Sequence, residues 1–367
     1  MRLLCRRRTL LRVAEKHAFV TIEEPGGWHA PAMAALVAGA LALAGCGEPA
    51  QPSTLPALPI DPASVTVSGL SSGAAMATQL HIAHSGVIHG AALVAGVPYQ
   101  CSSGTLRHSL GRCMKANEPI PTPELIELTS LLALEGYIDP IADLADDRVW
   151  IFRGALDPYV QKPVGDAIQS YYEALVNPAN VARVELEQAA HTFPTARTDA
   201  SACDETEPPF VGSCGYDGAA ALLGYLYGTL SPSRAPREGE LVEFDQQPYA
   251  KAAGSEGLAD KGLLFVPETC RAGGDRQCRL HVVFHGCKQG LPAIGRAFVL
   301  GSGYLEVAAA NHVVLLMPQI EASYHPLNPM GCWDWWGYEG EDYATKSGPQ
   351  VAAVRAMIAD LLGETRK

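Results

Sequence analysis

The sequence predicts an α/β fold with a mainly parallel central sheet and helices on both of its faces. Short runs rich in β-branched residues alternate with Ala- and Leu-rich stretches of helical periodicity, which is the pattern of strands joined by crossover helices. Of the 367 residues, 48% are hydrophobic, which is enough to bury the core of one large domain. The formal net charge is −12, without a Lys/Arg tract in the body of the chain, so we expect no binding to nucleic acid.

The expected strands cover residues 65–68, 91–95, 149–153, 184–187, 263–266, 280–284 and 313–317, and the expected helices include residues 72–84, 164–175 and 351–362. In the last of these helices the apolar residues recur at spacings of three and four, so they share one face. The segment Pro232–Glu240 is a linker-like interruption, which we interpret as a loop. Residues 63–367 are therefore expected to form a single domain.

The first 46 residues resemble an export signal. Three arginines at positions 6–8 precede an apolar run at 33–45, which is too short to cross a membrane as a mature helix. The run ends in Leu-Ala-Gly-Cys, similar to a bacterial lipobox, so Cys46 is the expected lipidation site. Plain secretion is the alternative. Residues 47–62 contain five prolines and predict an extended tether.

The chain has ten cysteines, and eight remain once Cys5 and Cys46 are assigned to the leader. An even number of cysteines in an exported chain predicts disulfides. The remaining cysteines group into the pairs Cys101 with Cys113, Cys203 with Cys214, and Cys270 with Cys278, which leaves Cys287 for Cys332. Other pairings are compatible with the sequence. No C-x-x-C is present, so we expect neither a zinc ribbon nor a thioredoxin-type redox centre.

The segment after the first expected strand has the pattern of a nucleophile. It reads Gly69-Leu70-Ser71-Ser72-Gly73, which matches G-x-S-x-G, and a helix of small residues follows. A strained strand-to-helix turn of this kind lifts the serine hydroxyl above the sheet and leaves the next N–H free for an oxyanion. We therefore predict that Ser71 is the nucleophile of an α/β-hydrolase and that Ser72 supplies an oxyanion donor.

A serine nucleophile needs a base held by a carboxylate, and in α/β hydrolases the three residues follow in the order Ser, Asp, His. Asp157 comes just past the expected strand at 149–153, and His191 comes just past the strand at 184–187. Both lie where the carboxyl ends of parallel strands place functional side chains. We predict Asp157 as the acid and His191 as the base.

Other titratable residues are less suitable as the catalytic acid or as metal ligands. Asp139 and Asp166 follow no comparable strand, and we interpret them as solvated or capping acids. His81 and His84 have the i, i+3 spacing of one helix face but no nearby carboxylate. We therefore expect no metal site and no cofactor.

The second oxyanion donor of an α/β-hydrolase normally follows an H-G motif upstream of the nucleophile, but here that motif lies near the C-terminus. The apolar run at 280–284 ends in His285-Gly286-Cys287, and the strand at 313–317 and the amphipathic helix at 351–362 follow. Moving this block ahead of the nucleophile would restore the usual order. The sequence therefore predicts a circularly permuted α/β-hydrolase.

This permuted order and the segments GLSSG, HTFPT, FHGCKQG and NPMGCWDWWGY resemble the catalytic domain of poly(3-hydroxybutyrate) depolymerases, from about residue 60 onwards. The resemblance implies a triad of Ser71, Asp157 and His191, with backbone N–H groups of Ser72 and Cys287 as the oxyanion hole. It also implies hydrolysis of a short-chain hydroxyalkanoate polyester outside the cell.

The resemblance further implies aromatic residues that flank a crevice. Trp335 and Trp336 are our candidates for substrate contact, and packing in the core is the alternative for both. Flat apolar rings suit a neutral aliphatic chain. The expected partner is therefore a polyester or oligoester bound by a monomer, with membrane contact only through a lipid on Cys46.

Two other functions fit parts of the sequence. Feruloyl or acetyl esterases of carbohydrates have similar H-G and G-x-S-x-G segments, but they usually place H-G before the nucleophile. A binding lipoprotein with a catalytically dead hydrolase fold would keep the sheet and lose the triad. The presence of all three triad residues and of the oxyanion segment argues against the second alternative.

Overall fold

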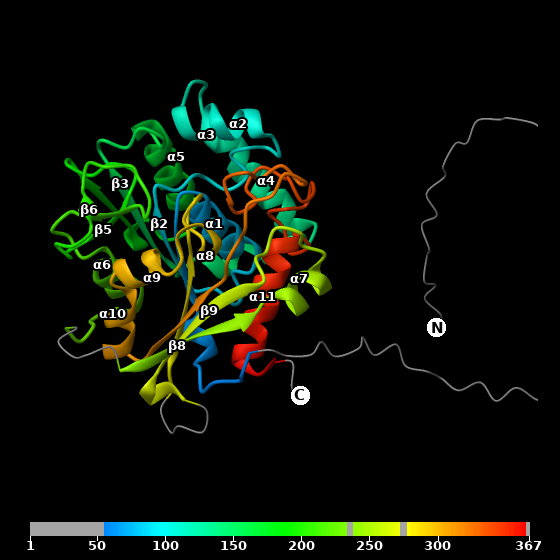
Figure 1. Cartoon of the computed structure of the whole chain (residues 1–367). Coiled ribbons are helices and arrows are strands. Elements are labelled where there is room, and N and C mark those ends of the chain that lie inside the picture. The colour runs from blue at the N-terminus through cyan, green and yellow to red at the C-terminus, as the bar shows by residue number, and fades with distance from the viewer. Residues whose placement is uncertain (1–54, 233–237, 272–276, 365–367) are drawn as a thin grey trace, which may run out of the picture. The chain divides into compact units, whose positions relative to one another are not determined.

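An eight-stranded sheet organises residues 55–232, 238–271 and 277–364, the part of the chain that the computed structural model describes (Figure 1). Its strand order is β4-β3-β2-β1-β10-β11-β9-β8. The bounds are β1 (Thr66–Leu70), β2 (Gly90–Val94), β3 (Arg148–Gly154), β4 (Val181–Leu186), β8 (Gly239–Asp245), β9 (Lys261–Pro267), β10 (Arg279–Phe284) and β11 (Val313–Met317). Neighbours from β4 to β11 are parallel, whereas β9 is antiparallel to β11 and to β8.

Helices cover both faces of this sheet, as Figure 1 shows. One face carries α1 (Ser72–Ala83), α4 (Thr122–Leu134), α5 (Lys162–Glu173) and α11 (Pro349–Leu362), and the other carries α6 (Gly218–Tyr227) and α10 (Tyr304–Ala310). The predicted fold class is thereby confirmed. In the described part of the chain, no helix is both long enough and apolar enough to cross a membrane.

Shorter elements lie in the connections. The helices are α2 (Leu106–Leu110), α3 (Arg112–Lys115), α7 (Gln247–Ala253), α8 (Leu291–Ile294) and α9 (Ala297–Gly301), with single 3₁₀ turns at Pro62–Ser64, Ile141–Leu144, Pro178–Asn180 and Glu268–Cys270. A small sheet of β5 (Phe193–Thr195), β7 (Val211–Ser213) and β6 (Ser201–Ala202) follows β4.

The helix α1 lies in the middle of the core. All twelve of its residues are buried, because α1 packs on β1, β2 and β10 and is itself in contact with α11. A helix that is buried all round has no solvated face, so most of its residues are small or apolar, and the buried His81 ring bonds Asp147 Oδ2 at 2.9 Å. The neighbouring strands β1 and β2 are also completely buried, as expected of parallel strands covered on both faces.

The strand order reveals the circular permutation. If the block from β8 to α11 preceded β1, the strands would lie across the sheet in the order 1-2-4-3-5-6-7-8, and the H-G loop would follow the third strand, as in α/β hydrolases. The Leu58 N–H donates to Leu361 O at 2.9 Å, so the start of the described body lies beside the end of α11. Such neighbouring ends are what a permutation requires.

The folded body begins earlier than the sequence predicts. The tether expected at 47–62 becomes part of the body from Leu55, which is only 1% exposed. The Ile60 side chain is also buried, and its backbone forms a parallel bridge with Cys278. The apolar residues between the prolines therefore pack on the body. Residues 47–54, the expected signal at 1–46 and Cys46 lie outside the described residues.

The segment interpreted as a loop, Pro232–Glu240, overlaps a strand at its last two residues, because β8 begins at Gly239 and pairs with β9. Residues 233–237 lie outside the described residues. β8 lies at one edge of the sheet, with β4 at the other, and it mixes charged with apolar residues. An edge strand of this composition lacks the continuous apolar run by which the buried strands are recognised.

We predict that reversing the permutation preserves the fold. A chain in which residues 238–364 precede residues 55–232, joined by a short glycine-rich linker, should lose no more than about 2 kcal/mol of unfolding free energy, because loop-closure entropy changes slowly with loop length. Urea unfolding monitored by circular dichroism measures this. A control chain opened inside β10 should not fold, and failure of the first chain to fold would contradict the proposed permutation.

Candidate active site

Ser71 occupies the sharp turn between β1 and α1. Its φ of 58° and ψ of −118° are costly for a residue with a side chain, and such strain is typical of functional positions. A Cβ atom on Gly69 would lie 2.2 Å from the Gly73 carbonyl, and one on Gly73 would lie 2.3 Å from Phe284 O. Close backbone contacts thus require both glycines, as expected of a nucleophile elbow.

Asp157 and His191 form a buried hydrogen-bonded pair after β3 and β4. His191 Nδ1 donates to Asp157 Oδ2 at 2.7 Å. Asp157 Oδ1 accepts the N–H groups of Tyr159 and Val160, each at 2.8 Å. Because both carboxylate oxygens are engaged, the pair is fixed with the proton on Nδ1, which leaves Nε2 as the basic nitrogen.

One cavity of about 410 Å³ brings the predicted base and the predicted nucleophile together, because both Ser71 and His191 line it. Asp157 lies behind His191 and is 6% exposed. The structure thus groups the three residues that a Ser-His-Asp triad requires.

The other two aspartates considered from the sequence lie in separate ion pairs. Asp139 pairs with Lys346 and accepts the Gly86 N–H. Asp166 pairs with Lys162 and Arg183 on the surface of α5. Neither is bonded to His191.

The predicted oxyanion donors are neighbours in the structure. Ser72 Oγ lies 3.3 Å from Cys287 Sγ, and neither backbone N–H has an acceptor among the described residues. The N–H groups on each side of Cys287 are engaged: Gly286 donates to Gln289 Oε1 and Lys288 to Met330 O, each at 2.7 Å. Two unpaired N–H groups next to a nucleophile can bind a developing oxyanion.

His285 orients the peptide that carries one of these donors. Its Nε2 accepts the Ile320 N–H at 3.1 Å, so Nδ1 carries the proton and donates to Gly286 O at 2.7 Å. Burial lowers the pKa of His285 to about 4, so the ring is neutral at neutral pH. Because C=O and N–H of a trans peptide point in opposite directions, this bond turns the Cys287 N–H away from His285.

Disulfides join the eight cysteines in the pairs named from the sequence, namely Cys101–Cys113, Cys203–Cys214, Cys270–Cys278 and Cys287–Cys332. The last of these ties the oxyanion loop to the tryptophan-rich segment. This bond closes a loop of 45 residues and holds two walls of the cavity together.

Two of the three tryptophans in this segment line the cavity, and the third is buried in the core. Trp335 and Trp336 line the cavity, with ring centroids 6.1 Å apart in a T-shaped arrangement. Trp335 is only 8% exposed, so it combines cavity lining with core packing. Trp333 is fully buried and packs edge-on against Phe284.

One buried carboxylate shapes the segment that follows these tryptophans. Asp334 Oδ1 accepts the N–H groups of Trp336, Gly337 and Tyr338, and Oδ2 accepts that of Glu339, at 2.7–3.2 Å. A carboxylate with four backbone donors fixes the path of the chain. Sequence reasoning did not single out Asp334.

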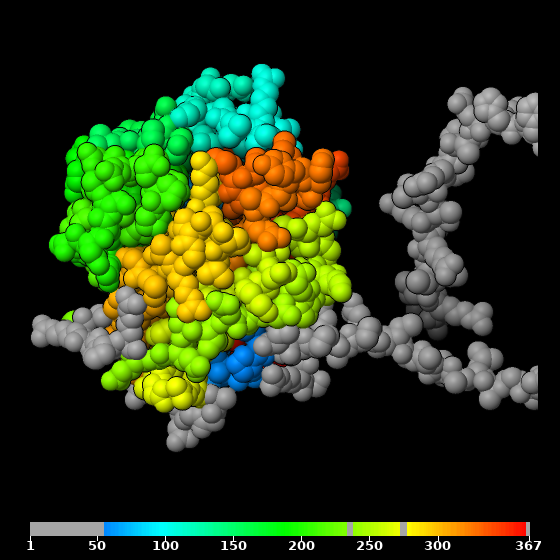
Figure 2. Space-filling view, in the orientation of Figure 1, coloured from blue at the N-terminus to red at the C-terminus, as the bar shows by residue number. Residues whose placement is uncertain are grey.

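Sequence reasoning also missed most of the cavity wall, which includes Leu106, Leu110, Met114, Tyr159, Phe210, Leu327 and Met330. These residues come from short helices and loops without a periodic pattern. Figure 2 shows the cyan residues of α2 and α3 next to the orange segment after β11, on one face of the body. Tyr159 packs edge-on against His191 with ring centroids 5.2 Å apart.

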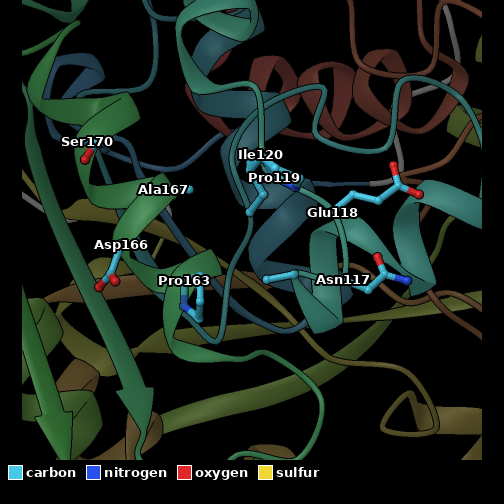
Figure 3. Close-up of a pocket in the computed structure, with 9 residues that line it drawn as sticks. Asn117, Glu118, Pro119, Ile120, Pro163, Asp166, Ala167 and Ser170 are labelled. Carbon is cyan, nitrogen blue, oxygen red and sulfur yellow. The ribbon is translucent and has the colours of Figure 1, made fainter.

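A second cavity, of about 400 Å³, lies between residues 116–120 and α5 (Figure 3). Figure 3 shows its side chains arising from these two segments, with Glu118 directed away from α5. None of the described residues that line it is a histidine. It therefore offers no histidine base for Ser170, the serine in its lining.

Comparison with known proteins points to one family, although no family model matches the chain. The chain is 40% identical over 328 residues to a poly(3-hydroxybutyrate) depolymerase of Delftia acidovorans, and spans 89% of its own length but 65% of that relative. It is 33% identical over 323 residues to a polyhydroxybutyrate depolymerase of Talaromyces funiculosus, covering 84% of the chain and 93% of the relative.

Comparison with solved structures points to the same family. The crystal structure of a PHB depolymerase from Penicillium funiculosum matches with a TM-score of 0.79 and 32% identity, over 85% of the chain and 99% of that structure. A PHB depolymerase with a serine-to-alanine substitution, complexed with an R3HB trimer, matches with the same values.

We predict that a serine-directed organophosphonate labels Ser71 and leaves the Ser71→Ala protein unlabelled at unchanged thermal stability. Asp157→Asn should slow labelling by about 10⁴-fold, because the imidazole loses the partner that fixes its tautomer. Mass spectrometry of the labelled peptide measures both effects. The matched controls Asp139→Asn and Asp166→Asn should label at the normal rate, and a large loss in either one would show that the acid is misassigned.

Proposed function

Because the chain belongs to the poly(3-hydroxybutyrate) depolymerase family, we propose that it is a serine esterase that hydrolyses this polyester or its oligomers. The observation that carries the proposal is the cavity shared by Ser71 and His191, with Asp157 bonded behind the histidine. Two unpaired N–H groups, of Ser72 and Cys287, complete the set of groups that ester hydrolysis needs.

In the proposed mechanism, His191 Nε2 takes the proton of Ser71 Oγ as the oxygen attacks the ester carbonyl. The N–H groups of Ser72 and Cys287 stabilise the negative charge that develops on the carbonyl oxygen. His191 then protonates the leaving alcohol, and an acyl-enzyme remains on Ser71. Water, activated by the same histidine, hydrolyses this ester and releases a carboxylic acid.

The composition of the cavity wall supports an aliphatic ester as substrate. Ten of the 18 described lining residues are leucine, methionine, proline, phenylalanine or tryptophan. Four of these side chains around the mouth are substantially exposed: Leu106, Leu110, Leu327 and Met330. Contact with such a surface would bury methyl and methylene groups at about 25 cal/mol per Å².

A carbohydrate ester, the alternative weighed from the sequence, would require polar groups that bind several hydroxyls. The amide side chain in the wall, Asn328, is already engaged: its Nδ2 bonds Cys332 O and Tyr338 OH, and its Oδ1 accepts the Cys332 N–H. Its hydrogen bonds hold the loop and leave little for a sugar. This favours the polyester.

We expect the purified protein to clear an amorphous poly(3-hydroxybutyrate) suspension and release 3-hydroxybutyrate. Feruloyl and acetyl-xylan esters should turn over at least tenfold more slowly at equal enzyme concentration, because the wall offers little to bind sugar hydroxyls. Ser71→Ala is the control for both activities. Good turnover of the carbohydrate esters without any of the polymer or its oligomers would leave only the serine-esterase proposal.

We also propose that the protein is exported and carries a lipid on Cys46. The four disulfides support an oxidising compartment. In a bacterial host, the wild-type protein should partition into the detergent phase of a Triton X-114 separation, and Cys46→Ala should move it to the aqueous phase because the anchor is lost. Partitioning unchanged by this substitution would argue for plain secretion.

A further inference from the structure

Lys288 places a cation in the wall of a mainly apolar cavity. Among the described residues that line the cavity, it is the one lysine, and none of them is an arginine, an aspartate or a glutamate. The residue is exposed, and no described carboxylate lies within ion-pair distance of its ammonium group. An unpaired ammonium in the wall of the cavity that Ser71 also lines is a candidate binding group for an anion.

The backbone of Lys288 is fixed close to the reacting atoms. The residue directly follows Cys287, whose disulfide to Cys332 holds the loop, and its N–H donates to Met330 O at 2.7 Å. Its φ is 59°, a left-handed conformation that a lysine adopts at some cost. The loop therefore holds a strained lysine beside the predicted oxyanion hole.

A second lysine near the cavity, Lys115, differs from Lys288 because its ammonium group has partners within the protein. The Lys115 ammonium lies 5.3 Å from the centroid of the Tyr159 ring and also donates to Pro158 O. Both contacts satisfy that cation within the protein. Lys288 has no such partner among the described residues, so its charge is available to a ligand.

The chemistry of the proposed substrate identifies the ligand. The ester groups and methyl groups of a hydroxyalkanoate oligomer are neutral, and its ionised group is the carboxylate at the end of the chain. A charge pair beside an apolar wall is stronger than the same pair in bulk water. We propose that the Lys288 ammonium binds the terminal carboxylate of an oligoester whose scissile carbonyl lies at Ser71.

This inference rests on the proposed function and refines it, because it makes Lys288 a determinant of which ester bond is cleaved. An oligomer held by its carboxylate end presents an ester bond near that end to Ser71. Interior bonds of a long polymer gain nothing from Lys288. The side chain would thus favour short products of earlier cleavage over intact polymer.

The test compares the free-acid trimer of 3-hydroxybutyrate with its methyl ester. In the wild-type protein, KM for the free acid should be about fivefold lower, the effect of one partly exposed ion pair. Lys288→Met should abolish this ratio, and Lys288→Arg should retain it. Methionine is unbranched and so suits the backbone conformation. Lys251→Met, which removes an exposed lysine of α7, is the matched control and should keep the ratio.

Two outcomes overturn the proposal. A wild-type ratio near one, or a ratio that survives in Lys288→Met, would show that the terminal carboxylate does not bind Lys288. If instead Lys288→Met only weakens competitive inhibition by 3-hydroxybutyrate, the bound carboxylate is that of the product. Should neither trimer be hydrolysed, the proposed function fails, and calorimetric binding of both trimers to Ser71→Ala still tests Lys288.

Discussion

The pairing of β1 with β10 is the constraint on which the candidate site depends. Thr66 lies opposite His281 in this parallel pair, and the histidine ring bonds Thr66 Oγ1 and Ser68 Oγ, each at 2.7 Å. Burial lowers the pKa of His281 to about 3, so the ring stays neutral and can donate one bond while it accepts the other. A slip of one residue would break both bonds and point the side chains to opposite faces.

This register also sets the distance between the nucleophile and the oxyanion loop. The two segments are 215 residues apart in the chain, yet Gly73 packs directly on Phe284 O. Strand pairing does not depend on the order in which the strands occur along the chain. A circular permutation can therefore leave the site unchanged, provided that the new ends lie where few contacts are interrupted.

The parts of the structure that the sequence predicts well are those with local signals. Ser71 lies in a motif between a strand and a helix, Asp157 follows the buried strand β3, and His191 follows β4, a half-buried strand at the edge of the sheet. The edge strand β8 and the apolar packing of residues 55–61 were missed, because charged residues and prolines obscure the patterns. The cavity wall from α2 and α3 was missed for another reason: tertiary contacts, and not periodicity, determine which exposed leucines meet.

The polar side chains around the cavity serve mainly to hold backbone in place. The side chains of Gln289, Asn328 and Asp334 bond backbone groups of the loops that carry the walls. Since these groups are already satisfied, few hydrogen-bonding partners remain for a ligand apart from Lys288 and the predicted catalytic groups. A substrate rich in hydroxyls would lose its bonds to water on entry without replacing them. A substrate with ester carbonyls and methyl groups makes few hydrogen bonds to water and therefore loses few on entry. The same contacts that make the site rigid thus also favour an aliphatic ester.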